Sequence, residues 1–193
     1  VLITGANGFV GQNLIAHLNE RADVEVLRFT RENSHVDLPE LVAQVDCIFH
    51  LAGVNRPQDP QEFQSGNTDL TQALCDAIRA SGKPLPVLYT SSSQAEQDNP
   101  YGSSKRGAEE ALLELASTLG AAVHLFRLPS VFGKWARPNY NSAVATFCHN
   151  ITRDLPIQIN DPHACISLVY IDDVVRHFVA VMDGQRVGGP FLS

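Results

Sequence analysis

A glycine-rich turn near the start of the chain constrains its fold more than any other feature. The segment from Thr4 to Gly11 reads TGANGFVG, and it lies between a short apolar stub and a run with apolar residues at helical spacing. This order predicts a strand, a tight turn and a helix. In such a turn Gly5 permits the sharp bend, Gly8 lets a pyrophosphate approach the backbone, and Gly11 allows the helix to pack closely on the sheet. The helix N-terminus attracts phosphate charge, so the turn indicates a dinucleotide site rather than an ordinary loop.

Four further apolar runs are typical of buried parallel strands, with helical stretches between them. The strands are expected at residues 24–29, 47–51, 85–89 and 122–126. The helices are expected at residues 9–20, 68–80, 103–118, 141–153 and 172–182, with one or two turns around 39–44. This alternation predicts an α/β fold, a Rossmann-like doubly wound parallel sheet.

A change of character near Pro129 predicts how the chain divides. The regular alternation ends there, and residues 133–141 are rich in Pro, Asn, aromatic and basic side chains. We expect a nucleotide-binding domain over residues 1–128 and a small, incomplete substrate-binding lobe over 129–193. Because the chain begins inside a strand and stops where another is expected to begin, we also expect it to be a fragment of a longer protein.

Composition narrows the class of ligand. The net charge of −7 and the pI near 5.4 argue against a nucleic acid or an anionic membrane surface as partner, so a small ligand is expected. The four cysteines stand singly in apolar stretches, which predicts buried thiols in a reducing cytosol, with neither disulfide nor metal site. The sequence contains no signal peptide or long apolar span, so a cytoplasmic location without membrane attachment is expected.

Tyr101 and Lys105 form a candidate catalytic pair. They are four residues apart and therefore share one face of a helix. An ammonium group near a phenol stabilises the phenolate, so Lys105 is expected to lower the pKa of Tyr101 toward neutrality. The tyrosine could then exchange a proton with a carbonyl or hydroxyl group of a substrate. The spacing is common by chance, and it gains weight from the glycine turn.

Several motifs together resemble the extended short-chain dehydrogenases that act on nucleotide sugars. They are TGxxGxxG, HLAG at 50–53, Asn67, the serines at 91–93, YxxxK, residues 127–133 and YIDDV at 170–174. The strings HLAGVNRP at 50–57, QDNPYG at 97–102, FGKW at 132–135 and RPNYN at 137–141 are similar to the capsular-polysaccharide reductases of the CapF type. These enzymes reduce the C4 ketone of a UDP-2-acetamido-dideoxy sugar on the way to UDP-N-acetyl-L-fucosamine. A zinc-binding cupin domain follows in that family, and this chain contains none.

The resemblance implies catalytic roles for Ser92, Tyr101 and Lys105. Ser92 would polarise the reacting carbonyl, although a shift of one residue would favour Ser93, and either serine could simply cap the strand end. Tyr101 would donate the proton, and Lys105 would hold the nicotinamide ribose. Ser93-Gln94 stands where sugar dehydratases have Asp-Glu, which argues against dehydration.

The end of the second strand predicts the cofactor. No acidic residue stands where NAD would be bound, whereas Arg28 and Arg31 could pair with the extra phosphate of NADP, so NADPH is favoured. Both arginines could instead be solvated surface cations, and Asn67 could be an N-cap rather than a ligand. By resemblance, the expected cofactor-binding residues are Gly5, Asn7, Gly8, Phe9, Val10, Gly11, Arg28, Arg31, Asp37, Leu38, Leu51, Ala52, Gly53, Asn67, Tyr101 and Lys105.

The substrate is expected to bind along a polar loop that also contains Trp135 and Tyr140. Such a loop suits a diphosphate and a stacked uracil. The expected substrate-binding residues are Asn55, Arg56, Lys134, Arg137, Asn139 and Asn141. His50, at a strand end, is expected to be a structural histidine rather than a base.

The leading interpretation is an NADPH-dependent reductase of a UDP-sugar C4 ketone. A UDP-sugar 4-epimerase with tightly bound NAD would use the same residues, and a non-catalytic NADP-sensing protein would not need them. By analogy with extended members, a homodimer is expected through the helices at 68–80 and 103–118.

Overall fold

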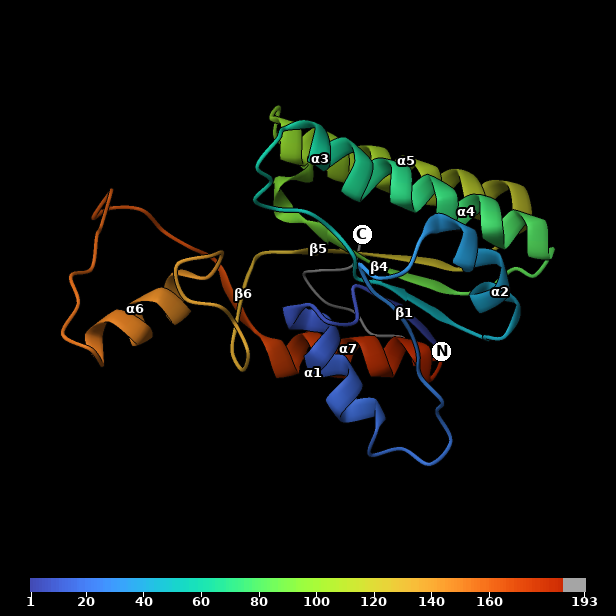
Figure 1. Cartoon of the computed structure of the whole chain (residues 1–193), viewed down its shortest axis with the longest axis horizontal. Helices are drawn as coiled ribbons and strands as arrows, with labels where there is room; N and C mark the ends of the chain where they lie inside the picture. Colours follow the sequence, from blue (N-terminus) through green and yellow to red (C-terminus); the bar gives the residue numbers. More distant parts are fainter. Residues whose placement is uncertain (186–193) are drawn as a thin grey trace.

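A five-stranded parallel sheet forms the centre of the computed structural model, which describes residues 1–185 (Figure 1). Its spatial order is β2-β1-β3-β4-β5, so the order reverses at β1. The strands are β1 Leu2–Thr4, β2 Leu27–Phe29, β3 Ile48–His50, β4 Val87–Ser92 and β5 Val123–Leu128. Ligands of open α/β sheets bind beyond the carboxyl ends of the strands at such a reversal, which here lies between β1 and β3.

Helices cover both faces of this sheet, which confirms the Rossmann-like doubly wound fold (Figure 1). One face packs against α2 (Leu38–Ala43), α4 (Leu70–Ser81) and α5 (Pro100–Leu119). The other packs against α1 (Phe9–Leu18) and α7 (Ile171–Met182). Successive strand residues point to opposite faces, so β1, β3, β4 and β5 each contribute apolar side chains to both cores.

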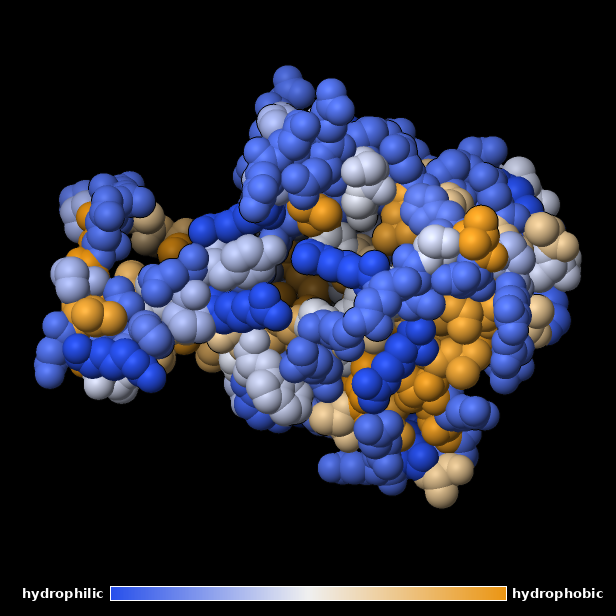
Figure 2. Space-filling model, viewed as in Figure 1, coloured by the Kyte–Doolittle hydropathy of each residue, from blue (hydrophilic) through white to orange (hydrophobic). Residues whose placement is uncertain are grey.

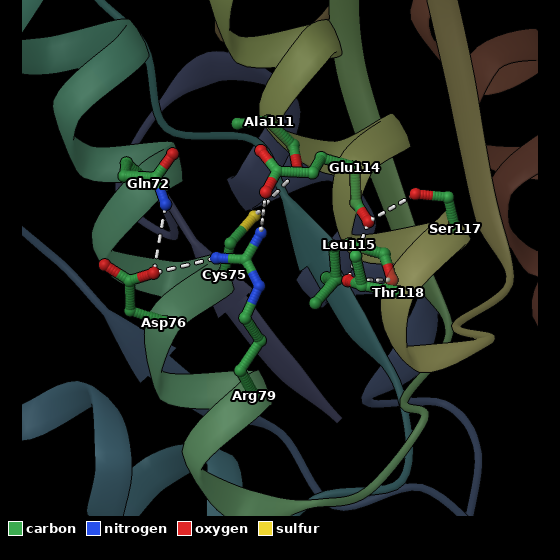
Figure 3. Close-up of polar contacts among 9 residues, drawn as sticks. All are labelled: Gln72, Cys75, Asp76, Arg79, Ala111, Glu114, Leu115, Ser117 and Thr118. Atoms are coloured by element: carbon green, nitrogen blue, oxygen red, sulfur yellow. Dashed lines mark hydrogen bonds and ion pairs between the residues drawn. The ribbon is translucent and has the colours of Figure 1, made fainter.

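The helices α4 and α5 lie side by side on their face of the sheet (Figures 1 and 3). Figure 3 shows Arg79 of α4 pointing toward Glu114 of α5, with 3.6 Å between guanidinium nitrogen and carboxylate oxygen. Beneath this pair, the thiol of Cys75 donates to the carbonyl oxygen of Ala111. The partly exposed ion pair adds little stability, and the buried apolar contacts hold the two helices together.

Two helices begin at other residues than predicted. Helix α5 begins at Pro100 rather than Ser103, because Asn99 Oδ1 accepts from the Gly102 amide at 2.8 Å and proline suits the first turn. Before α4, the short helix α3 (Gln61–Phe63) continues into the π-helical segment η2 (Gln64–Asp69). Short π segments are frequent at functional sites.

Between β5 and α7 the chain leaves the main sheet and forms a second, two-stranded sheet. The strands β6 (Ser130–Phe132) and β7 (Leu168–Tyr170) pair in parallel, and α6 (Ala143–Ile151) lies to one side of the main sheet (Figure 1). None of the residues of α6 is fully buried. The division at residues 128 and 129 stays a prediction, and the strand expected near 188–193 lies outside the described residues.

The cysteines follow the sequence prediction only in part. Cys47 and Cys75 are buried, whereas Cys148 and Cys165 are exposed, since the segment around α6 buries few side chains. Over residues 1–185, every helix is too short or too polar to pass through a lipid bilayer.

Candidate active site

The glycine turn lies directly against the backbone that follows β3. Gly5 has φ +67°, and a Cβ atom added to it would stand 2.7 Å from the Ala52 amide nitrogen. A Cβ atom on Gly11 would stand 2.5 Å from the carbonyl oxygen of Gly5. Gly11 therefore lets α1 pack closely against the turn that continues β1.

The N-terminus of α1 is open to an anion. Its N-cap is Gly8, which provides no side-chain hydrogen bond, and the first turn contains no acidic residue. The backbone amides of Phe9, Val10 and Gly11 belong to the first turn, whose donors have no intrahelical acceptor. Asn7 and Gly8 are exposed. These features fit a phosphate group of a dinucleotide.

Ser92 and Tyr101 meet at the carboxyl end of β4. Ser92 is the last residue of β4, and its hydroxyl accepts from the Gln94 amide at 3.1 Å. It also hydrogen-bonds the Tyr101 side chain, whereas Ser93 is exposed in the short 3-10 helix η3 (Ser93–Glu96). The structure therefore brings Ser92 rather than Ser93 to Tyr101, and Ser92 caps η3 as well.

The pKa of Tyr101 moves in the opposite direction to the prediction. Burial raises this pKa, and the hydrogen bond with Ser92 lowers it only in part. Lys105 instead directs its ammonium group to the carbonyl oxygen of Thr90, at 2.9 Å. The phenol is therefore protonated at neutral pH, which is the state required of a proton donor.

Lys105 is buried beneath this site. Its Nζ lies 4.9 Å from the centre of the Tyr89 ring, and a Cβ atom on Gly53 would stand 3.0 Å from it. Burial lowers the pKa of Lys105 to about 8, and the nearby carboxylate of Glu109 opposes this effect. The missing side chain at Gly53 keeps the space above the ammonium group free.

Asn67 is a bridge between loops and not an N-cap. It is buried inside the π-helical segment η2, where its side-chain oxygen accepts from the Val54 amide at 2.9 Å. Its side-chain nitrogen donates to the Val54 carbonyl at 3.0 Å and to the Ser104 hydroxyl at 2.9 Å. Asn67 thus fixes the loop after β3 against the helix that contains Tyr101 and Lys105.

His50 has the structural role predicted from its position. Its ring is buried and hydrogen-bonds the hydroxyls of Thr4 at 2.7 Å and Thr71 at 2.8 Å. Burial, and then the charge of Lys105, lower its pKa to about 3, so the ring stays neutral. Thr4 also accepts from the Ala52 amide at 3.1 Å, which ties β1 to the loop after β3.

The residues expected to bind the adenosine end of the cofactor differ in how exposed their side chains are and in whether those side chains already have partners. Arg28 is exposed within β2 rather than beyond it, and Arg31 is exposed two residues after the strand. Asp37 accepts from the Ser34 amide at 2.9 Å and caps a short 3-10 turn. Leu38 is fully buried in the core, so a contact with adenine would have to come from its backbone.

The loop expected to bind substrate is largely exposed. Its residue Lys134 forms an ion pair with another residue of the chain. Lys134 Nζ lies 2.9 Å from Asp172 Oδ1 at the start of α7, so its charge is already paired. Trp135 and Asn139 have φ values of 65° and 56°, which are uncommon for residues with a side chain. Arg137, Asn139 and Asn141 of this loop are exposed. In the loop after β3, Arg56 is exposed and Asn55 is half-buried.

Figure 2 shows hydrophilic side chains around a hollow with a hydrophobic floor near the middle of the viewed face. No group of three or more His, Cys, Asp or Glu side chains in the described part of the chain is arranged to hold a metal ion.

Three residues of this region were missed from the sequence. The Phe63 ring lies 5.6 Å from that of Tyr101, and Glu109 and Arg127 pair under β4 with 2.7 Å between nitrogen and oxygen. Glu109 follows Lys105 by four residues, so the helical spacing could have indicated it. Nothing in the local sequence indicates Phe63, because its contact depends on the α3 turn.

Comparison with known proteins agrees with this fold. Residues 1–191 match the NAD dependent epimerase/dehydratase family. The chain is 66% identical over 185 residues to the UDP-2-acetamido-2,6-beta-L-arabino-hexul-4-ose reductase of Pseudomonas aeruginosa, a match that covers 96% of this chain and 50% of that protein. It is also similar to the crystal structure of the capsular polysaccharide assembling protein CapF from Staphylococcus aureus. That similarity has a TM-score of 0.86 and 40% identity, covering 98% of this chain and 52% of the other.

A more distant relative shares the fold alone. The UDP-glucuronic acid 4-epimerase from Bacillus cereus, solved in complex with NAD, has a TM-score of 0.84 at 21% identity, covering 100% of this chain and 79% of the other. The chain spans about half the length of the Pseudomonas and Staphylococcus proteins. The family model matches residues 1–191, and the chain has the Rossmann-like sheet and the open glycine turn described above. The chain therefore belongs to the NAD dependent epimerase/dehydratase family.

Proposed function

We propose that this chain is the reductase part of an enzyme that uses NADPH to reduce the C4 ketone of a UDP-2-acetamido-2,6-dideoxy-hexul-4-ose. The observation that carries the proposal is the contact of Ser92 with Tyr101 above a buried Lys105. The 66% identical Pseudomonas reductase supports the reaction and the substrate. The CapF similarity supports a place in capsular polysaccharide synthesis.

The proposed mechanism assigns one task to each side chain. Ser92 donates a hydrogen bond to the C4 oxygen and orients the ketone toward Tyr101. Tyr101 transfers its phenolic proton to that oxygen as negative charge develops there. Lys105, held by Thr90, stabilises the phenolate left behind until solvent returns the proton. Bound NADPH would supply the hydride that reaches C4.

The residues of this chain fit such a cofactor. The open amides at the start of α1 suit the pyrophosphate, and the bare surface of Gly53 leaves the Lys105 ammonium accessible to a ribose. We infer that Arg28 and Arg31 bind the phosphate that distinguishes NADPH from NADH. Both are exposed at the edge strand, next to the end of β1.

Cofactor choice gives the first prediction. NADPH should bind about tenfold or more tightly than NADH, because a charge-assisted hydrogen bond contributes about 1.5 to 3 kcal/mol. Changing Arg28 and Arg31 together to alanine should remove the preference, whereas Arg176→Ala, an exposed cation on α7, should not. Fluorescence titration measures both dissociation constants. Equal affinity in the unchanged protein would overturn the assignment.

We propose further that the protein acts in the cytoplasm as a homodimer, with α4 and α5 forming the interface. These helices lie together on one face of the sheet, and Leu113 of α5 is 52% exposed there. Sedimentation velocity on the protein and on Leu113→Lys tests this: a dimer that dissociates in the variant supports the interface, and a monomer throughout contradicts it.

The function itself is tested with purified protein, NADPH and a panel of UDP-4-keto sugars. We expect loss of NADPH absorbance with a UDP-2-acetamido-4-keto sugar. A protein that is purified with tightly bound oxidised cofactor, and that consumes no NADPH with any keto sugar, would instead be an epimerase.

A further inference from the structure

A buried carboxylate pairs with an arginine directly beneath the candidate site. Glu109 is 3% exposed and accepts two hydrogen bonds from Arg127, at 3.0 Å from Nε and 2.7 Å from Nη2. The Ser91 hydroxyl donates a further, short hydrogen bond to the same carboxylate. Arg127 also reaches Glu96 in η3, at 2.7 Å. The network thus joins the end of β4, the connection η3, the helix α5 and the strand β5.

Glu109 and Lys105 approach the same stretch of β4. They are four residues apart on α5, so their side chains leave the same face of the helix. Lys105 donates to the carbonyl oxygen of Thr90, and Ser91, the next residue, donates to Glu109. The residue after Ser91 is Ser92, whose hydroxyl meets Tyr101.

We propose that Glu109 is a positioning residue: its buried carboxylate keeps Lys105 protonated and fixes the end of β4 that presents Ser92. The consequence for catalysis rests on the proposed function. The effect on Lys105 does not, because it can be measured in the free protein.

Among the titratable groups around Lys105, Glu109 is the one that carries a negative charge near pH 7. Two other titratable groups lie near the ammonium, the Tyr89 ring on β4 and His50 on β3, and Tyr101 stands one turn earlier on the same helix. The pKa of His50 is lowered to about 3, and burial raises those of both tyrosines, so all three are neutral near pH 7. Burial tends to raise the pKa of Glu109, but hydrogen bonds from Arg127 and Ser91 outweigh it and the pKa is lowered. Glu109 is therefore ionised.

The test is the titration of Lys105 in the free protein. The sequence contains three lysines, Lys83, Lys105 and Lys134, so ¹³C labelling at the lysine Cε atom gives few NMR signals to assign. Glu109→Gln removes the negative charge that opposes the burial effect on Lys105. We expect the Lys105 midpoint to fall by about one unit, the size typical of one close charge. At pH 8 this leaves about fivefold less of the charged lysine.

Glu96→Gln is the matched control. It makes the same chemical change on another partner of Arg127, in a side chain that is 77% exposed and not in contact with Lys105. The Lys105 midpoint should stay in place. Glu109→Asp keeps a charge on a shorter side chain, should move the midpoint less, and serves where the glutamine variant does not fold.

The second measurement is the pH dependence of reductase activity. In Glu109→Gln the basic limb of the pH profile for kcat/KM, which reports groups of the free enzyme, should move down with the Lys105 midpoint, because the charged lysine is the active form. A lower kcat with an unmoved limb and an unmoved midpoint would mean that Glu109 only stabilises the fold, and would overturn the inference. Absence of reductase activity in the unchanged protein would sink the proposed function and leave the titration result standing.

Discussion

Tyr101→Phe is expected to lower kcat for the keto sugar by about a hundred- to ten-thousand-fold, the usual contribution of a general acid. The substitution keeps the ring and its contact with Phe63 at 5.6 Å between centroids, and removes only the hydroxyl that meets Ser92. Cofactor affinity should change little. Stopped-flow loss of NADPH absorbance gives the rate, and fluorescence titration gives the affinity.

Tyr89→Phe provides the comparison for that experiment. The Tyr89 hydroxyl is buried and has no hydrogen-bond partner among residues 1–185, so its removal should leave kcat within about twofold. The two variants delete the same atom, from the buried Tyr89 ring and from the half-buried Tyr101 ring. Full activity of Tyr101→Phe would show that another group supplies the proton.

Gly5→Ala is expected to lower the free energy of unfolding by about 2 to 5 kcal/mol and to abolish cofactor binding. The positive φ alone costs about 1 to 2 kcal/mol for a residue with a side chain. The new methyl group would also meet the Ala52 amide nitrogen at 2.7 Å, and overpacking adds about 1 to 3 kcal/mol. The turn must shift to relieve this contact, which moves the amides that face the pyrophosphate.

Gly82→Ala separates these two costs. Gly82 has the same φ of +67°, at the end of α4, but an added Cβ atom has nothing within 4 Å. It should lose only the conformational part, about 1 to 2 kcal/mol, and bind cofactor normally. Urea unfolding measures both variants. Equal losses would mean that the contact between the turn and the loop after β3 does not constrain the site.

The sheet and the glycine turn could be predicted because their signals are local. Apolar runs of strand length separated by amphipathic segments define a parallel sheet, and glycines between a strand and a helix define the turn. The spacing of Tyr101 and Lys105 likewise places both on α5 without knowledge of the fold.

Other features depend on contacts between distant segments and could not be predicted. Asn67 looks like an N-cap in the sequence, and only the approach of the Val54 loop and α5 makes it a bridge. The pairing of Lys134 with Asp172 depends on the position of α7. The pKa of Tyr101 was predicted in the wrong direction, because the sequence does not tell how deeply the ring is buried.

In the proposed mechanism, Tyr101 and the cofactor act together on a C4 ketone. The most direct test supplies NADPH deuterated at the reactive C4 position of the nicotinamide, with a UDP-2-acetamido-4-keto sugar, and locates the label in the product by mass spectrometry and NMR. We expect one deuterium at C4 of the reduced sugar in the unchanged protein, and almost none in the same reaction time with Tyr101→Phe. Label-free sugar despite NADPH consumption, or equal labelling in both proteins, would contradict this mechanism.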